Sequence, residues 1–284
     1  MPKKSSPVAL PAEPAPPVRL SVRKTYKLFI GGKFPRSESG RTYVVNGDNV
    51  ALASRKDARD AVLAARVAQA KWAGATAYNR GQVLYRVAEM LEARRAEFAA
   101  LGVPAGELDA AADRWVWYAG WADKIAQVAG SANPVAGPFF NISAPEPTGV
   151  VAVVAPPSLL GLTSVIAPAV VTGNTAVVLA PDPQVGITLA EVLATSDVPG
   201  GVVNILTGRH AETAPWLASH ADVNALDLTG VEHADLAAEL ERSAAGTLKR
   251  VVRHRPGADF TGDPGLRPMT MLLETKTVWH PKGE

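Results

Sequence analysis

The 284-residue chain contains no cysteine, and this absence removes several kinds of chemistry at once. Without a thiol there is no disulfide, no thiolate metal site and no cysteine nucleophile. The five histidines lack the short spacings of a metal-binding motif, so no metal site is expected. A cysteine-free chain fits a reducing compartment, and we expect a cytoplasmic location.

The chain also has little net charge. Its 29 basic and 27 acidic residues leave a formal charge of +2, which implies neither a nucleic-acid partner nor a membrane surface. Hydrophobic residues make up 47% of the sequence, enough to form the core of one large or two ordinary domains.

Charged residues are missing altogether from Pro147 to Pro181. This stretch is longer than the ~20 residues that a membrane helix needs. Prolines and glycines interrupt it, however, at places that suit turns between short elements. We therefore expect a buried strand, a turn, a helix and a second strand, and we reject a membrane span.

Before this stretch, the chain divides into three segments. Residues 1–22 form a proline-rich leader without the apolar run of a signal peptide, expected to be disordered, with a docking arm as the alternative. Residues 23–137 contain a small hairpin at Gly31-Gly32 and three amphipathic helices. The helices are expected at about Asp57–Trp72 with Asp57 as the N-cap, at Asn79–Ala99 and at Glu107–Ala129. Residues 138–147 form a strand.

The third of these helices carries an aromatic and apolar cluster at helical spacing. Such a cluster is more often part of a core or a subunit interface than of a cofactor site. The residues are Trp115, Tyr118, Ala122, Ile125 and Ala129, with Trp117 and Trp121 on another part of the surface.

Residues 148–255 alternate between apolar β-branched runs and helical patterns, which is typical of a doubly wound parallel sheet. Ligands of such sheets bind at the carboxyl ends of the strands. The expected strands are Val150–Val154, Thr175–Leu179, Val202–Leu206, Val223–Leu228 and Leu248–Val252. The first expected helix follows the strand Val150–Val154 and ends at Val171. The others are Ile187–Thr195, Ala211–Ser219 and Ala234–Ala244.

The last segment, residues 256–284, is a polar loop followed by one extended run from Met269 to Trp279. A lone terminal strand needs a sheet edge to pair with, on its own chain or on another subunit.

Several segments in this order resemble the aldehyde dehydrogenase superfamily. They are Lys27–Arg41 (KLFIGGKFPRSESGR), Pro145–Pro156 (PEPTGVVAVVAP), Gly173–Val178 (GNTAVV), Pro199–Gly208 (PGGVVNILTG), His220–Gly230 (HADVNALDLTG), Leu248–Val251 (LKRV) and Leu273–Pro281 (LETKTVWHP). The resemblance implies an α/β fold with a Rossmann-like parallel sheet of aldehyde dehydrogenase type, together with oligomerisation strands.

The last two matches are nearly adjacent, whereas in full-length relatives the catalytic domain lies between them. The resemblance therefore implies an internal deletion, with the catalytic domain and its nucleophilic cysteine absent. His254 takes the place of the family's general-base glutamate, and we interpret it as a surface loop histidine. No catalytic residue is expected.

The cofactor contacts that the resemblance implies are degenerate. Ser158 replaces an asparagine that helps to bind the oxyanion, and Leu179 or Ala180 replaces a ribose-facing lysine, with Asp182 as the following acid. Gly208 and Gly230 remain as turn glycines, but Val231 stands where a backbone would approach the pyrophosphate. We expect no tightly bound cofactor and at most weak binding of NAD or NADP.

Three functions follow from the resemblance, and we favour the first. The chain is a non-catalytic subunit that assembles with a full-length NAD(P)-dependent aldehyde dehydrogenase through Phe139–Ile142 and Met271–Val278. Alternatively, it is an oxidoreductase component that is active only in such an assembly, where the partner supplies cysteine and glutamate. The third candidate is a nucleotide-binding sensor.

Overall fold

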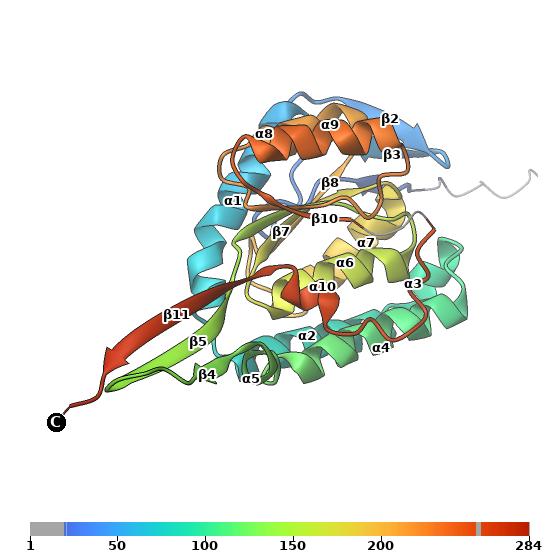
Figure 1. Ribbon diagram of the computed structural model, residues 1–284. Helices are drawn as coiled ribbons and strands as arrows, with labels where there is room; N and C mark the ends of the chain where they lie inside the picture. Colours follow the sequence, from blue (N-terminus) through green and yellow to red (C-terminus); the bar gives the residue numbers. More distant parts are fainter. Residues whose placement is uncertain (1–19, 21, 254–256, 284) are drawn as a thin grey trace, which may run out of the picture.

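The computed structural model describes residues 20, 22–253 and 257–283. Almost all of the expected leader, and His254, therefore lie outside the described residues. A five-stranded sheet occupies the centre of the molecule, helices cover both faces, and a long antiparallel arm extends to one side (Figure 1).

The central sheet is parallel throughout, with the strand order β10-β9-β6-β7-β8. This confirms the expected doubly wound α/β fold. Its strands are β6 (Val150–Val154), β7 (Thr175–Ala180), β8 (Val203–Thr207), β9 (Ala225–Asp227) and β10 (Arg250–Val252). The connecting helices are α6 (Leu159–Val171), α7 (Pro183–Ala194), α8 (His210–Ser219) and α9 (Ala234–Ala245).

The charge-free stretch from Pro147 to Pro181 forms β6, α6 and β7, as expected. Every residue of these three elements is buried, because α6 lies between the sheet and an outer layer of helices. A helix that is apolar on all sides is stable only in such a position. Among the described residues, no helix is long and apolar enough to cross a membrane.

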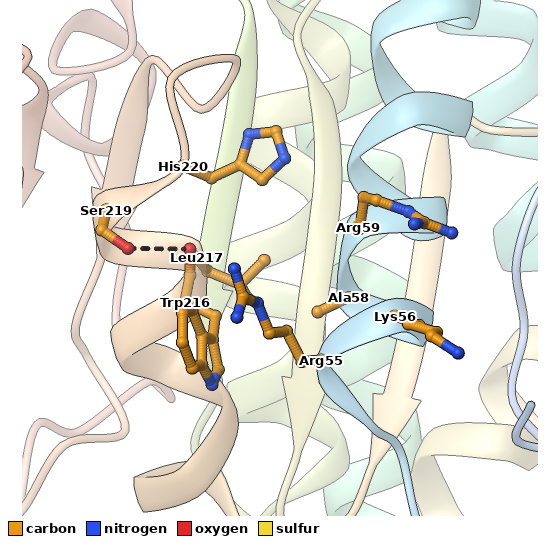
Figure 2. A pocket seen from close by; sticks show the side chains of 8 residues that line it. All are labelled: Arg55, Lys56, Ala58, Arg59, Trp216, Leu217, Ser219 and His220. Carbon is orange, nitrogen blue, oxygen red and sulfur yellow. Dashed lines mark hydrogen bonds between the residues drawn. The ribbon is translucent and has the colours of Figure 1, made fainter. Parts of the chain in front are cut away.

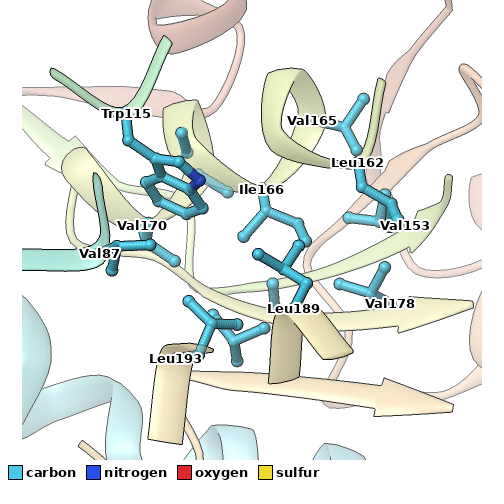
Figure 3. Close-up of a cluster of buried hydrophobic side chains, with 14 of the residues drawn as sticks. Val87, Trp115, Val153, Leu162, Val165, Ile166, Val170, Val178, Leu189 and Leu193 are labelled. Atoms are coloured by element: carbon cyan, nitrogen blue, oxygen red, sulfur yellow. The ribbon is translucent and has the colours of Figure 1, made fainter. Parts of the chain in front are cut away.

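The outer layer over α6 consists of α2 (Ala77–Ala93) and α4 (Ala105–Trp121). Trp115 of α4 is fully buried and packs with Ile166 and Val170 of α6 in the larger apolar core (Figure 3). Tyr118, Ala122 and Ile125 are buried in the same core. The core interpretation of the aromatic cluster is therefore confirmed.

The opposite face of the sheet is covered by α1 (Arg55–Ala73), α8 and α9, which enclose a second, smaller core. Helix α1 begins two residues before the expected Asp57. Ser54 is the N-cap, and Asp57 is the third helical residue that completes a capping box. The prediction of Asp57 as the N-cap was therefore wrong. The side chain of Ser54, three residues earlier, accepts the hydrogen bonds from the first N–H groups of the helix.

Two of the expected helices are each divided into two. The second breaks at Arg94, where α2 ends and the short α3 (Arg95–Ala100) begins and buries Phe98. The third ends at Trp121, before α5 (Ile125–Ala129). Periodicity alone does not indicate such breaks, because the apolar face continues across each of them.

The small hairpin expected at Gly31-Gly32 is present. Ile30 and Lys33 exchange backbone hydrogen bonds of 3.0 Å across the two glycines, both with positive φ, and Leu28 N donates to the Pro35 carbonyl at 3.1 Å. On its other side, Phe29 bonds to Ile205 of β8, with N···O distances of 2.8 and 2.9 Å. The regular hairpin joins β2 (Thr42–Val45) to β3 (Asp48–Ala51) through Asn46-Gly47, both with positive φ. Strand β1 (Thr25–Tyr26) pairs with β3.

The arm is a three-stranded antiparallel sheet with the order β11-β5-β4, formed by β4 (Ser131–Asn133), β5 (Phe139–Pro147) and β11 (Leu273–Pro281). The extended run expected from Met269 begins later, because residues 267–270 form the short helix α10 (Arg267–Thr270). Residues 253–266 connect β10 to α10.

Strand β11 pairs with β5 of its own chain along its whole length, from Leu273 opposite Pro147 to Pro281 opposite Phe139. The tail strand therefore does not need another subunit to satisfy this edge. Of the two alternatives for its pairing, the chain uses its own sheet edge.

Candidate functional site

The carboxyl edge of the parallel sheet carries a pocket of about 210 Å³ between the loops that follow β6 and β9. The chain leaves β6 toward β7 and β8 on one side and later returns to β9 on the other. A reversal of this kind opens a crevice at the carboxyl ends of the strands, where α/β proteins bind ligands. Two predicted residues, Ser158 and Gly230, line this pocket together with Val231.

Ser158 has a structural partner in this pocket. Its Oγ accepts a hydrogen bond from the Gly161 N–H at 2.9 Å, which makes it the N-cap of α6. An oxygen that already caps a helix is less available to a ligand than a free hydroxyl.

Gly230 holds the two loops together. Its N–H donates to the Val154 carbonyl at 2.8 Å, and a Cβ added at this position would lie 2.1 Å from the Ala155 carbonyl oxygen. Only a glycine allows this approach of one backbone to the other. The glycine is therefore required for packing the loops, whether or not a ligand binds.

The other two predicted residues lie elsewhere along the same edge. Asp182 is the N-cap of α7, and its Oδ1 accepts from Gln184 N and Val185 N, each at 3.0 Å. Gly208, with φ of +133°, follows β8 and packs against Leu52. Neither residue lines the pocket of Ser158 and Gly230. The structure therefore brings together two of the four predicted residues.

His210, the first residue of α8, is a polar group that the sequence reasoning missed. Its Nε2 is buried and has no hydrogen-bond partner among the residues that the structure describes. Burial lowers the pKa of His210, and a hydrogen bond to the backbone of Ala180 opposes this shift. The neutral ring thus lies beside Ala180, one of the two positions aligned with the ribose-facing lysine. Its sequence spacing carried no signal of this.

A larger cleft of about 490 Å³ lies between α1 and α8, away from the strand ends (Figure 2). The Arg55 guanidinium stacks on the exposed Trp216 ring at 3.7 Å from its centroid. Two other cations of this cleft, Lys56 and Arg59, pair with acidic residues. None of the predicted site residues lines it.

Across the described ranges, no cluster of three or more histidine, aspartate or glutamate side chains is arranged to hold a metal ion. The whole chain contains no cysteine. His254, which aligns with the family's general-base glutamate, lies outside the described residues.

The parallel sheet, its strand order and the crevice at the switch point define a Rossmann-like α/β protein. A sequence model of the aldehyde dehydrogenase family matches residues 45–261. This chain belongs to that family.

Full-length relatives extend well beyond it. The chain is 33% identical to cytosolic aldehyde dehydrogenase 1 of Elephantulus edwardii, over 85% of this chain and 52% of that protein. It is 32% identical to human retinal dehydrogenase 2, over 87% of this chain and 52% of that protein. The chain thus spans about half the length of the curated relatives it matches.

The solved structures that this chain resembles are likewise covered over about half of their length. An NAD⁺ complex of the aldehyde dehydrogenase from Bacillus cereus superposes with a TM-score of 0.75 at 26% identity, covering 81% of this chain and 50% of that one. The HpcC protein of Thermus thermophilus superposes with a TM-score of 0.74 at 29% identity, covering 81% and 48%. The fold is therefore that of the aldehyde dehydrogenases, over about half of their length.

Proposed function

We propose that this chain is a non-catalytic subunit that assembles with a full-length NAD(P)-dependent aldehyde dehydrogenase. The absence of cysteine supports the first half of this proposal, because the family resemblance assigns nucleophilic attack to a thiolate. The short connection of residues 253–266 between β10 and α10 supports it further, since this is where the resemblance places a catalytic domain.

The arm is the observation that carries the second half. It extends away from the body of the molecule and exposes large apolar side chains on both of its long strands. Phe140 is 55% exposed, Ile142 52% and Trp279 57%. Exposed apolar groups gathered on one projecting sheet are typical of an interaction surface.

The strand edges of the arm point to the same use. Within the described part of the chain, β11 has a neighbouring strand on one side only, and so does β4. An exposed strand edge presents free N–H and C=O groups that another sheet can bind. A partner subunit would cover both the edge and the apolar groups.

The test is a native-mass measurement on the tagged chain recovered from its own cells, with every co-purifying polypeptide identified. We expect a defined complex with a cysteine-bearing aldehyde dehydrogenase. Ile142→Glu, on the arm, should abolish the complex. Val67→Glu, which places the same charge at an exposed position on α1, should leave it intact. Recovery of the chain alone would contradict the proposal.

We further infer that binding of NAD or NADP is weak. The pocket at the strand ends holds about 210 Å³, below the ~300 Å³ at which small-molecule pockets usually begin. Leu179 or Ala180 stands where the resemblance expects a lysine. Calorimetry of the isolated chain with NAD, NADP and adenine nucleotides tests this inference, and tight binding of any of them would favour a nucleotide sensor.

A further inference from the structure

The cleft between α1 and α8 has the composition of a binding site, although it lies away from the strand ends (Figure 2). Its volume of about 490 Å³ falls within the ~300–1,000 Å³ of small-molecule pockets. Ala58 and Leu217, each 2% exposed, give it an apolar surface. The described residues that line it include three cations and no acid. A cleft of this charge favours an anionic ligand.

Trp216 lines this cleft and is 41% exposed. Tryptophan side chains are highly buried on average, and their large rings are enriched at binding surfaces. Figure 2 shows Arg55 extending from α1 toward the Trp216 ring, where its guanidinium lies 3.7 Å from the ring centroid. This stacking fixes the plane of the guanidinium but does not use the N–H groups at its edge.

The charge of Arg55 is not balanced within the part of the chain that the structure describes, where its side chain makes no hydrogen bond or ion pair. The other two cations of the cleft differ in this respect. Lys56 pairs with Glu38 at 3.2 Å. Arg59 pairs with Asp60 at 2.8 Å. Arg55 is also the first residue of α1, where the helix dipole disfavours a positive charge. An anion beside Arg55 would satisfy its donors and balance its charge.

His220 supplies a second donor at the end of α8. Its Nδ1 accepts a hydrogen bond from the Asp222 N–H at 3.2 Å, so the proton of the neutral ring is on Nε2. Figure 2 shows the side chains of His220 and Arg55 directed into the space between the two helices. The Ser219 hydroxyl, in contrast, donates to the Pro215 carbonyl at 2.9 Å and is used by its own helix. The guanidinium of Arg55 and the Nε2 of His220 are therefore the donors available to a ligand.

We propose that this cleft binds a small aromatic oxyanion, a planar ring that carries a carboxylate or a phosphate. The edge of a stacked arginine matches two oxygens of such a group, and the ring packs against Trp216 and the apolar surface beside it. At ~30 Å³ per water-sized group, 490 Å³ holds about sixteen non-hydrogen atoms. This is enough for a ring and its charged group but not for a dinucleotide. The site does not depend on the assembly or the cofactor binding proposed above.

The experiment titrates the whole chain with benzoate and with phenyl phosphate at constant ionic strength, observed by calorimetry. Benzamide lacks the charge and acetate lacks the ring, so they are the comparisons. We expect saturable binding of the aromatic oxyanions, and the tighter of the two identifies the preferred charged group. Arg55→Gln should weaken this binding about tenfold or more, as the loss of hydrogen bonds between charged groups implies. Trp216→Leu should also weaken it, because the stack that orients Arg55 is lost.

Arg86 of α2 provides a matched control. It is also an exposed helical arginine, but it does not line the cleft. Arg86→Gln makes the same change in net charge as Arg55→Gln and should leave binding of the oxyanions unchanged. Because the substituted side chains are exposed, all three variants should be folded, which thermal unfolding checks. The absence of saturable binding, equal binding to Arg55→Gln and Arg86→Gln, or binding of benzamide or acetate as tight as that of benzoate would overturn the proposal.

Discussion

At the scale of single residues, Asp57 is the side chain on which the most local structure depends. Its carboxylate accepts from Ser54 N at 2.8 Å, from the Ser37 hydroxyl at 2.7 Å and from Glu38 N at 3.1 Å. It therefore joins the start of α1 to the loop before β2.

We expect Asp57→Ala to lower the free energy of unfolding by about 1–3 kcal/mol, because it removes a cap and leaves buried donors without an acceptor. Asp60→Ala, at a half-exposed position on the same helix where the side chain makes only a surface ion pair with Arg59, should change stability by ~0.5 kcal/mol or less. Urea unfolding of both variants measures the difference. Equal effects would show that the capping box is unimportant.

His210 predicts a pH dependence of stability. Because burial lowers its pKa in the folded protein, the unfolded chain takes up a proton first as the pH falls below about 6.5. The contribution of His210 to the free energy of unfolding is therefore fully present above pH ~6.5. It is lost as the pH falls toward the lower pKa of the folded protein, and it amounts to ~1.4 kcal/mol for each unit by which folding lowers the pKa.

We expect His210→Gln, which does not titrate, to flatten the stability profile just below pH 6.5. Thermal unfolding of wild type and variant across this range measures the effect. Parallel profiles would show that the buried Nε2 is stabilised in another way.

At the scale of elements, the arm is held together by pairing and by a row of polar side chains across its strands. Asn133 of β4 donates to Ser143 of β5 at 2.8 Å, and the hydroxyls of Ser143 and Thr277 of β11 lie 2.8 Å apart. In an antiparallel pair, alternate residues direct their N–H groups toward the neighbouring strand.

Hydrogen exchange should therefore alternate along β11 in the isolated chain. Amides directed to β5 should be protected, and those on the outer edge should exchange rapidly. If a partner pairs with this edge, the outer amides should become protected in the complex. Uniform protection of β11 in the isolated monomer would contradict the exposed edge.

At the scale of the whole molecule, a well-packed body contrasts with an exposed arm. The two apolar cores lie on opposite faces of the parallel sheet, whereas the outer residues of the arm face solvent. If the arm binds a second subunit, the melting temperature of the complex should rise with protein concentration, because association stabilises the folded state by mass action.

Differential scanning fluorimetry over a range of concentrations measures this dependence. Ile142→Glu should remove it while Val67→Glu preserves it. A melting temperature of the complex that does not vary with concentration would indicate that the arm contributes nothing to assembly.

The parallel sheet could be predicted from sequence because its strands are buried on both faces and therefore appear as uninterrupted apolar runs. Val150–Val154 and Thr175–Ala180 are clear examples. The boundaries of helices such as α2 and α4 were harder, because an amphipathic pattern continues through a break. Of the four candidate cofactor residues, Ser158 and Gly230 meet because both follow strands adjacent at the switch point.

The sequence by itself determined the fold class, the family and the lack of a thiol nucleophile, because apolar periodicity and residue identity are properties of the chain alone. Only the tertiary structure decided that β11 pairs with its own β5 and that Ser158 and Gly230 line one pocket. These contacts join residues far apart in sequence, and their geometry depends on how the helices pack and not on any local pattern.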